Sequence, residues 1–424
     1  MKKYFFFALA AAGLLSSCSS DDTVAGTEVE NDELVPIQIG FGGGSVSVDE
    51  TRGTGTVGGY QATEENKWHS QKFNVYMLKK GTMEIAQFEG ADIYKNQLFT
   101  APGTAFAAMG DNPVGPRTSG IARPDDNKIK YYPTQDNFDF FAYRLDDATS
   151  ATPAFVGDSL SVDFTINGSQ DILVAKAIPT TADINTLKAI NGNAANADRY
   201  YSSFSARHGV QPNLNFKHLL TRLTFQVMPK GNSTDATSHI VIDAIKVVAK
   251  KTKGTLTIAK VGDNNGDSQK ITWYETTAPV ELALMQRDST KLVDPITNID
   301  SLALIAMNPF SFKGLKTDTA YAVGEALLLA PETEYELKVY GHQEILDEYG
   351  ETTTHTNTFV YTDKIQKPSQ YTPLMASSVS YNVIISLWGV SNISINAELN
   401  GWTDGSAANM YFEPEETKIN GFAD

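Results

Sequence analysis

The chain has 424 residues, of which 41% are hydrophobic and 20% are charged, so it is long and apolar enough to bury more than one core. Its formal net charge of −16 disfavours polyanionic partners, and we expect no binding of nucleic acid. A single cysteine cannot form a disulfide framework, so the fold must be stabilised by packing and strand pairing.

Residues 1–17 have the pattern of a signal peptide. Two lysines precede an apolar run at residues 5–15, which is too short to span a bilayer. The sequence LSSC at residues 15–18 resembles a bacterial lipobox, in which the thiol becomes the attachment point for lipid. We therefore predict that Cys18 is lipidated and holds the exported chain at the outer membrane by its acyl chains. The acidic stretch SSDD at residues 19–22 resembles a signal for display on the cell surface.

Residues 18–52 are predicted to be a lipidated tether that carries one strand. In the middle of this region, four apolar side chains alternate with small or polar ones, which is the period of a half-buried strand. They are Val35, Ile37, Ile39 and Phe41. The glycine-rich stretch that follows at residues 42–60 contains Arg52 and Gly53, and is a natural site for proteolysis.

From residue 53 onward, most of the chain consists of short alternating runs separated by turn clusters. Clear runs lie at residues 73–77, 160–166, 223–227, 335–339 and 381–387. Helical periodicity is scarce, and residues 183–197 hold either a short helix or a loop. The pattern predicts an all-β protein with two tandem antiparallel β-sandwich domains, at residues 53–212 and 213–424.

Several short segments, taken in their order and spacing, resemble the fimbrillin family, the subunits of donor-strand pili. Besides the lipobox and the first strand, they are TRGTGT at residues 51–56, YYP at 131–133 leading to FDFFAY at 138–143, SQDILVA at 169–175, FKHLLTRL at 216–223 and the final GW at 401–402. The resemblance implies two transthyretin-like β-sandwich domains in a subunit of a cell-surface fimbrium. It also implies a lipoprotein precursor whose first strand is removed by an arginine-specific protease. The groove left behind would then accept a strand from the next pilin subunit.

Elementary energetics support such strand removal in part. Cleavage between Arg52 and Gly53 would release residues 18–52 as a prosegment and leave unpaired N–H and C=O groups beside an open apolar groove. An alternating strand from another chain would repair both defects by β-strand addition. Four buried apolar side chains contribute roughly 6–12 kcal/mol as an upper estimate. An uncut surface loop with an incidental arginine is the alternative that the sequence leaves open.

The C-terminal segment at residues 407–424 is a candidate donor strand. Its apolar centre is Met410, Tyr411 and Phe412. Pro414 and three glutamates weaken it as a long donor, and a final edge strand with a frayed tail is the alternative. Whether the protein is a stalk, tip or anchor subunit therefore stays open.

No motif indicates catalysis, a metal or a cofactor, and we expect none of the three. The sequence GFGGG at residues 40–44 is not followed by a predicted helix, as a nucleotide-binding loop would be. In DNNGD at residues 263–267 the glycine is at the fourth instead of the sixth position of a calcium loop, and Tyr274 stands where that loop needs a glutamate. His218 lies among apolar residues and is predicted to be structural. The runner-up function is an uncleaved surface lipoprotein that binds glycans or another ligand on a host or bacterial surface. The candidate stacking residues, for which core packing is the commoner role, are Trp68, Trp273, Trp388 and Trp402.

Overall fold

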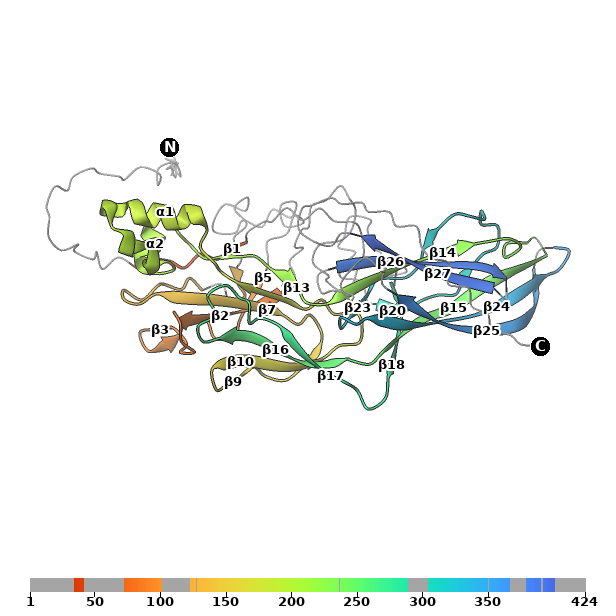
Figure 1. Cartoon of the computed structure of the whole chain (residues 1–424), viewed down its shortest axis with the longest axis horizontal. Coiled ribbons are helices and arrows are strands. Elements are labelled where there is room, and N and C mark those ends of the chain that lie inside the picture. Colours follow the sequence, from red (N-terminus) through yellow and green to blue (C-terminus); the bar gives the residue numbers. More distant parts are fainter. Residues whose placement is uncertain are drawn as a thin grey trace, which may run out of the picture. The chain divides into compact units, whose positions relative to one another are not determined.

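The computed structural model describes residues 34–41, 72–100, 123–126, 128–235, 237–288, 304–349, 351–366, 379–389 and 392–400. Within these ranges the regular structure is mostly β-strand, joined by turns and loops, with helices confined to residues 181–207 (Figure 1). No helix of the described ranges is long and apolar enough to cross a membrane. The predicted all-β class with tandem sandwiches is confirmed.

The first sandwich consists of two sheets that share a buried core. The six-stranded sheet has the order β13-β11-β7-β2-β5-β6, with strands β2 (Lys72–Lys79), β5 (Gln97–Thr100), β6 (Arg123–Pro124), β7 (Phe138–Arg144), β11 (Leu173–Lys176) and β13 (Lys217–His218). The five-stranded sheet has the order β17-β16-β10-β8, with β9 also paired to β10. Its strands are β8 (Thr149–Ser150), β9 (Ala154–Val156), β10 (Ser159–Thr165), β16 (Lys253–Lys260) and β17 (Ile271–Tyr274). Tyr76, Phe141, Val162 and Leu256 are among the side chains buried between them.

The six-stranded sheet is buried on both faces. Strand β7 is buried at all seven positions, so its sequence FDFFAYR shows no simple alternation. Alternate side chains of β2 and β7 belong to a second cluster, which we call the outer core. It consists of Val35, Ile37, Ile39, Phe73, Val75, Met77, Ala86, Ile93, Tyr94, Phe99, Tyr132, Phe138, Phe140, Ala142, Ala175, Ala177, Leu187, Tyr201, Phe204, Val210 and Leu214.

Four small elements contribute to the outer core or border it. They are the hairpin β3 (Gln87–Phe88) and β4 (Ala91–Asp92), the parallel pair β1 (Gly40–Phe41) and β12 (Asn213–Leu214), helix α1 (Thr181–Ala189) and helix α2 (Ser203–Arg207). Helix α1 begins with a capping box, in which the Thr180 side chain accepts from the Asp183 N–H and the Asp183 carboxylate accepts from the Thr180 N–H. Of the two alternatives predicted for residues 183–197, a short helix or a loop, the structure has a helix in the first part of this range.

The second sandwich encloses a separate core between two further five-stranded sheets. One has the order β22-β14-β26-β27 with β23 beside β14, and the other has the order β18-β15-β24-β25 with β21 beside β15. The strands are β14 (Thr221–Pro229), β15 (Ser238–Ala249), β18 (Val280–Ala283), β21 (Phe310–Ser311), β22 (Tyr321–Ala322), β23 (Leu327–Leu329), β24 (Glu334–Leu346), β25 (Thr352–Gln366), β26 (Val379–Gly389) and β27 (Asn392–Asn400). A two-stranded sheet of β19 (Met285–Arg287) and β20 (Leu304–Ala306) lies outside them. The sheets are not uniformly antiparallel, because β14 and β26 pair in parallel over nine residues.

Strands beyond residue 212 contribute to both sandwiches. The hairpin β16–β17 leaves the second sandwich and pairs with β10 of the first, with Val162 opposite Leu256. The Leu328 N–H donates to the Gly168 C=O at 2.7 Å, which adds a further link. The division of the chain between residues 212 and 213 therefore stays a prediction, and any such division has to assign β16 and β17 to the first sandwich's sheet.

Candidate functional site

Residues 34–41, which we call the N-terminal ribbon, lie against the outer core. Burial alternates along the ribbon: Val35 and Ile37 are each 8% exposed and Ile39 is 1% exposed, while Pro36 and Gln38 point to solvent. Three of the four predicted strand residues therefore join one buried cluster. The fourth, Phe41, forms part of β1.

The ribbon is hydrogen-bonded on both sides. On one side it runs antiparallel to residues 130–132, where the Ile37 N–H donates to the Lys130 C=O and the Tyr132 N–H donates to the Val35 C=O, both at 2.9 Å. On the other side β1 runs parallel to β12, and the Gly40 N–H donates to the Pro212 C=O at 2.8 Å. Only Gly40–Phe41 of the ribbon forms regular strand. The ribbon is therefore attached by a short ladder of main-chain hydrogen bonds and, to a larger extent, by its buried side chains.

Aromatic side chains form much of the outer core beside the ribbon. The Tyr132 ring packs edge to face on Phe140, with centroids 6.3 Å apart, and Phe140 packs in the same way on Tyr201 at 5.9 Å. Burial raises the pKa of both tyrosines, so both phenols stay neutral at physiological pH. Such a surface favours an apolar strand over a charged ligand.

One further side chain contacts the ribbon. Gln211, which lies between α2 and β12, hydrogen-bonds to the main chain of Pro36 and Gln38. The predicted domain boundary between residues 212 and 213 lies next to it in the sequence, which gave no sign of this contact. The signal for this contact is a glutamine directly before a proline, at a position where the proline interrupts a parallel ladder.

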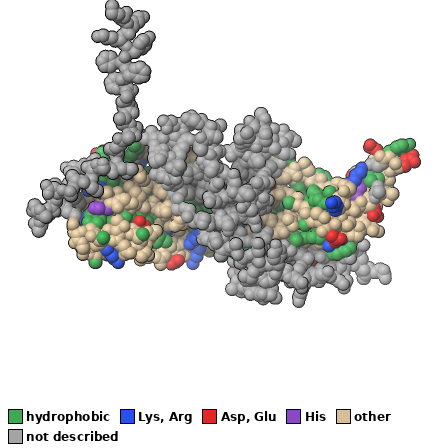
Figure 2. Space-filling model, turned by 90° about the horizontal axis from the view of Figure 1, so that it is seen from above, with side chains coloured by type: hydrophobic (Ala, Val, Ile, Leu, Met, Phe, Trp, Pro, Cys, Tyr) green, Lys and Arg blue, Asp and Glu red, His purple; other side chains and the backbone are tan. Residues whose placement is uncertain are grey.

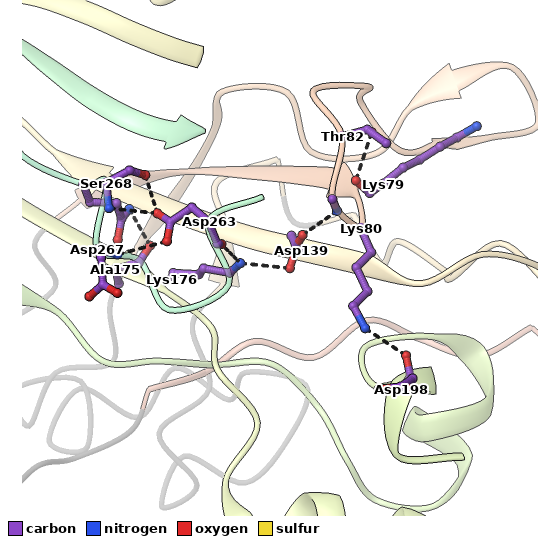
Figure 3. A network of polar contacts seen from close by, with 12 residues as sticks. Lys79, Lys80, Thr82, Asp139, Ala175, Lys176, Asp198, Asp263, Asp267 and Ser268 are labelled. Carbon is purple, nitrogen blue, oxygen red and sulfur yellow. Dashed lines mark hydrogen bonds and ion pairs between the residues drawn. The ribbon is translucent and has the colours of Figure 1, made fainter. Parts of the chain in front are cut away.

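The polar network in Figure 3 connects strands and turns of the first sandwich and has a structural role. Lys176 Nζ lies 3.2 Å from Asp139 Oδ1, and both side chains are less than 10% exposed. The same ammonium group donates to the Asp263 C=O, and Asp139 Oδ2 accepts from the Gly81 N–H at 2.9 Å. The Asp263 carboxylate accepts from the N–H groups of Asp267 and Ser268, which makes this stretch a turn.

Four histidines, His208, His218, His239 and His342, are also held by structural partners. His218 Nδ1 lies 2.9 Å from Asp171 Oδ1 on a fully buried carboxylate, as expected of a structural histidine. Nearby, burial raises the pKa of Asp146 to about 7, even though Arg144 Nη2 lies 2.7 Å from its Oδ1. A search of the described residues finds no group of three or more histidine, cysteine or acidic side chains able to hold a metal ion.

The remaining predicted sites fall mostly outside the described residues. Cys18, Arg52 and Gly53, the donor candidates Met410, Tyr411 and Phe412, and also Trp68 and Trp402 lie there. Trp273 packs edge to face on Phe164 at 5.6 Å, against the core between the sheets of the first sandwich, whereas Trp388 on β26 of the second sandwich is 36% exposed. On the face shown in Figure 2, the described surface carries basic and acidic side chains intermixed, without a continuous basic patch.

Comparison with known proteins gives one family match. The model of a family described as fimbrillin-like matches residues 61–402. A search of curated proteins finds no match. Among solved structures, the chain is similar to a fimbrial protein from Bacteroides vulgatus, with 14% identity, coverage of 87% of this chain and 100% of that chain, and a TM-score of 0.44.

Two further solved structures show the same level of similarity or less. A candidate cell adhesion protein from Bacteroides uniformis has 13% identity, coverage of 87% of this chain and 99% of that chain, and a TM-score of 0.43. The fimbrial anchor protein Mfa2 from Porphyromonas gingivalis has 10% identity, coverage of 86% and 98%, and a TM-score of 0.27. At TM-scores below 0.5 these similarities carry no further argument.

Proposed function

Because this chain belongs to the fimbrillin-like family of fimbrial and adhesion proteins, which are structural subunits and not enzymes, we propose that it is a pilin precursor assembled by donor-strand exchange. The family places it at the cell surface, in assembly with other pilin subunits. In this proposal the exported chain is lipidated at Cys18 and held at the outer membrane. Cleavage between Arg52 and Gly53 then separates the N-terminal ribbon from the two sandwiches.

The observation that carries the proposal is the position of the N-terminal ribbon. It precedes Arg52 in sequence, yet Val35, Ile37 and Ile39 complete a core that belongs to the rest of the chain. Burial of three such side chains contributes roughly 4.5–9 kcal/mol as an upper estimate. The same burial of apolar side chains that holds the ribbon in place would therefore also stabilise an incoming strand.

Loss of the ribbon would leave two kinds of defect. The Lys130 C=O, the Tyr132 N–H and the Pro212 C=O would lose their main-chain partners, and the buried tyrosines and phenylalanines of the outer core would meet water. A strand with apolar side chains at alternate positions repairs both defects at once. The segment around Met410, Tyr411 and Phe412 of another copy is the donor that this sequence offers.

The N-terminus of pilus material sheared from the cell surface tests the proposal. We expect Gly53 as the mature terminus, and we expect heat-labile ladders of oligomers on gels. The variant Arg52→Ala should retain the acylated Cys18 terminus and form no ladder. Arg117→Ala is the matched control, because Arg117 is also followed by small residues and lies C-terminal to the proposed cut.

One result would overturn the proposal. If an acylated Cys18 is the only mature terminus in the wild-type protein and no ladder forms, strand exchange is wrong. The protein would then be an uncleaved surface lipoprotein, for which binding of glycans or host ligands is the function to test.

A further inference from the structure

The side-chain amide of Gln211 forms hydrogen bonds to main-chain atoms of the N-terminal ribbon. Its Nε2 donates to the Pro36 C=O at 3.3 Å, and its Oε1 accepts from the Gln38 N–H at 3.3 Å. The same Oε1 accepts from the Tyr132 hydroxyl at 3.2 Å. The side chains of Pro36 and Gln38 point to solvent, away from the buried face of the ribbon.

The parallel ladder beside this contact ends for a chemical reason. Gly40 lies opposite Asn213, and the Gly40 N–H donates to the Pro212 C=O at 2.8 Å. With this register, the next rung toward the N-terminus would need an N–H on residue 212 to donate to the Gln38 C=O. Pro212 has no N–H, so the backbone cannot supply that rung.

The Gln211 amide takes the place of the rung after that one. In the same register the Pro36 C=O and the Gln38 N–H would pair with the main chain of residue 210, but the Val210 N–H donates to the Ser205 C=O at 2.9 Å instead. A residue of a parallel strand donates its N–H to one C=O of its neighbour and accepts the N–H found two residues further on. The Gln211 side chain does both around Ile37, with the Pro36 C=O and the Gln38 N–H. A primary amide offers the same donor and acceptor pair as a peptide group.

Two main-chain groups fix which way this amide faces, because the Gln38 N–H can only donate and the Pro36 C=O can only accept. Oε1 therefore faces Gln38, and there it also accepts from the Tyr132 hydroxyl. Burial keeps the Tyr132 phenol protonated, so it remains a donor across the physiological pH range. The orientation of the amide is therefore independent of pH in that range.

We propose that Gln211 is a positioning residue that supplies a side-chain rung to whichever strand occupies the outer core. For the chain's own ribbon this role follows from the contacts above. For a strand from another copy it rests on the proposed function. Because Gln211 hydrogen-bonds to main-chain atoms, it can hold a strand without selecting the side chains at positions 36 and 38. Selectivity for particular side chains would come from the buried positions 35, 37 and 39.

Hydrogen exchange of the uncut, full-length chain tests this role, with residue-level resolution from fragmentation in the mass spectrometer. In Gln211→Ala we expect the Gln38 amide to exchange about tenfold faster, because it loses its acceptor and the ribbon opens more often. Amides of β14 should keep their rates. Gln87→Ala is the matched control, since Gln87 also bonds through its side chain, to Asp92, but lies away from the ribbon's main chain.

A second variant separates shape from hydrogen bonding. Gln211→Glu keeps the size of the side chain but directs a carboxylate oxygen at the Pro36 C=O in place of a donor. We expect faster exchange of the Gln38 amide here as well, while the melting temperature of the protein stays close to that of the wild type. The inference is wrong if neither variant changes the Gln38 amide, or if both accelerate β14 to the same extent. This readout needs no cleavage at Arg52, so its failure and the failure of strand exchange are distinguishable.

Discussion

The substitution Ile39→Ala tests whether the ribbon opens independently of the rest of the fold or only together with it. Ile39 is 1% exposed and belongs to the outer core. Truncation of a buried isoleucine to alanine typically costs about 2–5 kcal/mol. The three buried ribbon side chains together contribute roughly 4.5–9 kcal/mol, so this change removes about half of what retains the ribbon.

Hydrogen exchange of the uncut chain measures the effect. A loss of about 2 kcal/mol corresponds to roughly 30-fold faster exchange, and we expect at least this increase for the amides of Ile37 and Gly40. Gln38→Ala is the matched control in the same ribbon, because its side chain is exposed, and should change these rates by less than about twofold. If Ile39→Ala accelerates exchange in β2 and β7 as strongly as in the ribbon, ribbon and sheet open together. Release of the ribbon as a separate unit would then be wrong.

Three further predictions concern the two sandwiches. The folded-state pKa of Asp146, about 7, lies above its unfolded value, so its contribution to stability is present at pH 4 and lost as the pH rises through 7. Urea unfolding over this range should show the loss in the wild type, and Asp146→Asn should flatten it. Asp139→Ala should lower the free energy of unfolding by about 3–5 kcal/mol, because Lys176 stays buried without its carboxylate, whereas the double replacement with Lys176→Met should restore most of it. Gly341→Ala should lower the melting temperature by several degrees, because an added Cβ would lie 2.5 Å from a carbonyl oxygen of β15.

Local periodicity was enough to place several of the longer strands, for a clear physical reason. Where one face of a strand is buried and the other is wet, the sequence alternates, as it does along β10 and much of β24. The ribbon follows the same rule at Val35, Ile37 and Ile39, although only Gly40–Phe41 is regular strand. Burial against a core, rather than ladder formation, produced that pattern.

Features that depend on distant parts of the chain could not be read locally. The parallel pairing of β14 with β26 joins residues more than 150 positions apart, and no pattern within either strand specifies its direction. The return of β16 and β17 to the first sandwich is of the same kind. The capping box at Thr180 and Asp183 was legible in the sequence, but the surrounding alanines, asparagines and glycine weakened the helical signal.

The way the ribbon is held also explains how one segment can belong to the core and still be exchangeable. The pairing of β14 with β26 fixes nine consecutive residue pairs, and its loss would open a whole sheet. Among the described residues, the ribbon's main chain is held by the bonds to Lys130, Tyr132 and Pro212, by the two-residue ladder with β12 and by the Gln211 amide, so few bonds must break before it can leave. Its free energy lies mainly in buried apolar area, which is non-directional and is recovered by any strand that places apolar side chains at alternate positions. A partner strand therefore needs to match the spacing of Val35, Ile37 and Ile39 more closely than it needs to match their sequence.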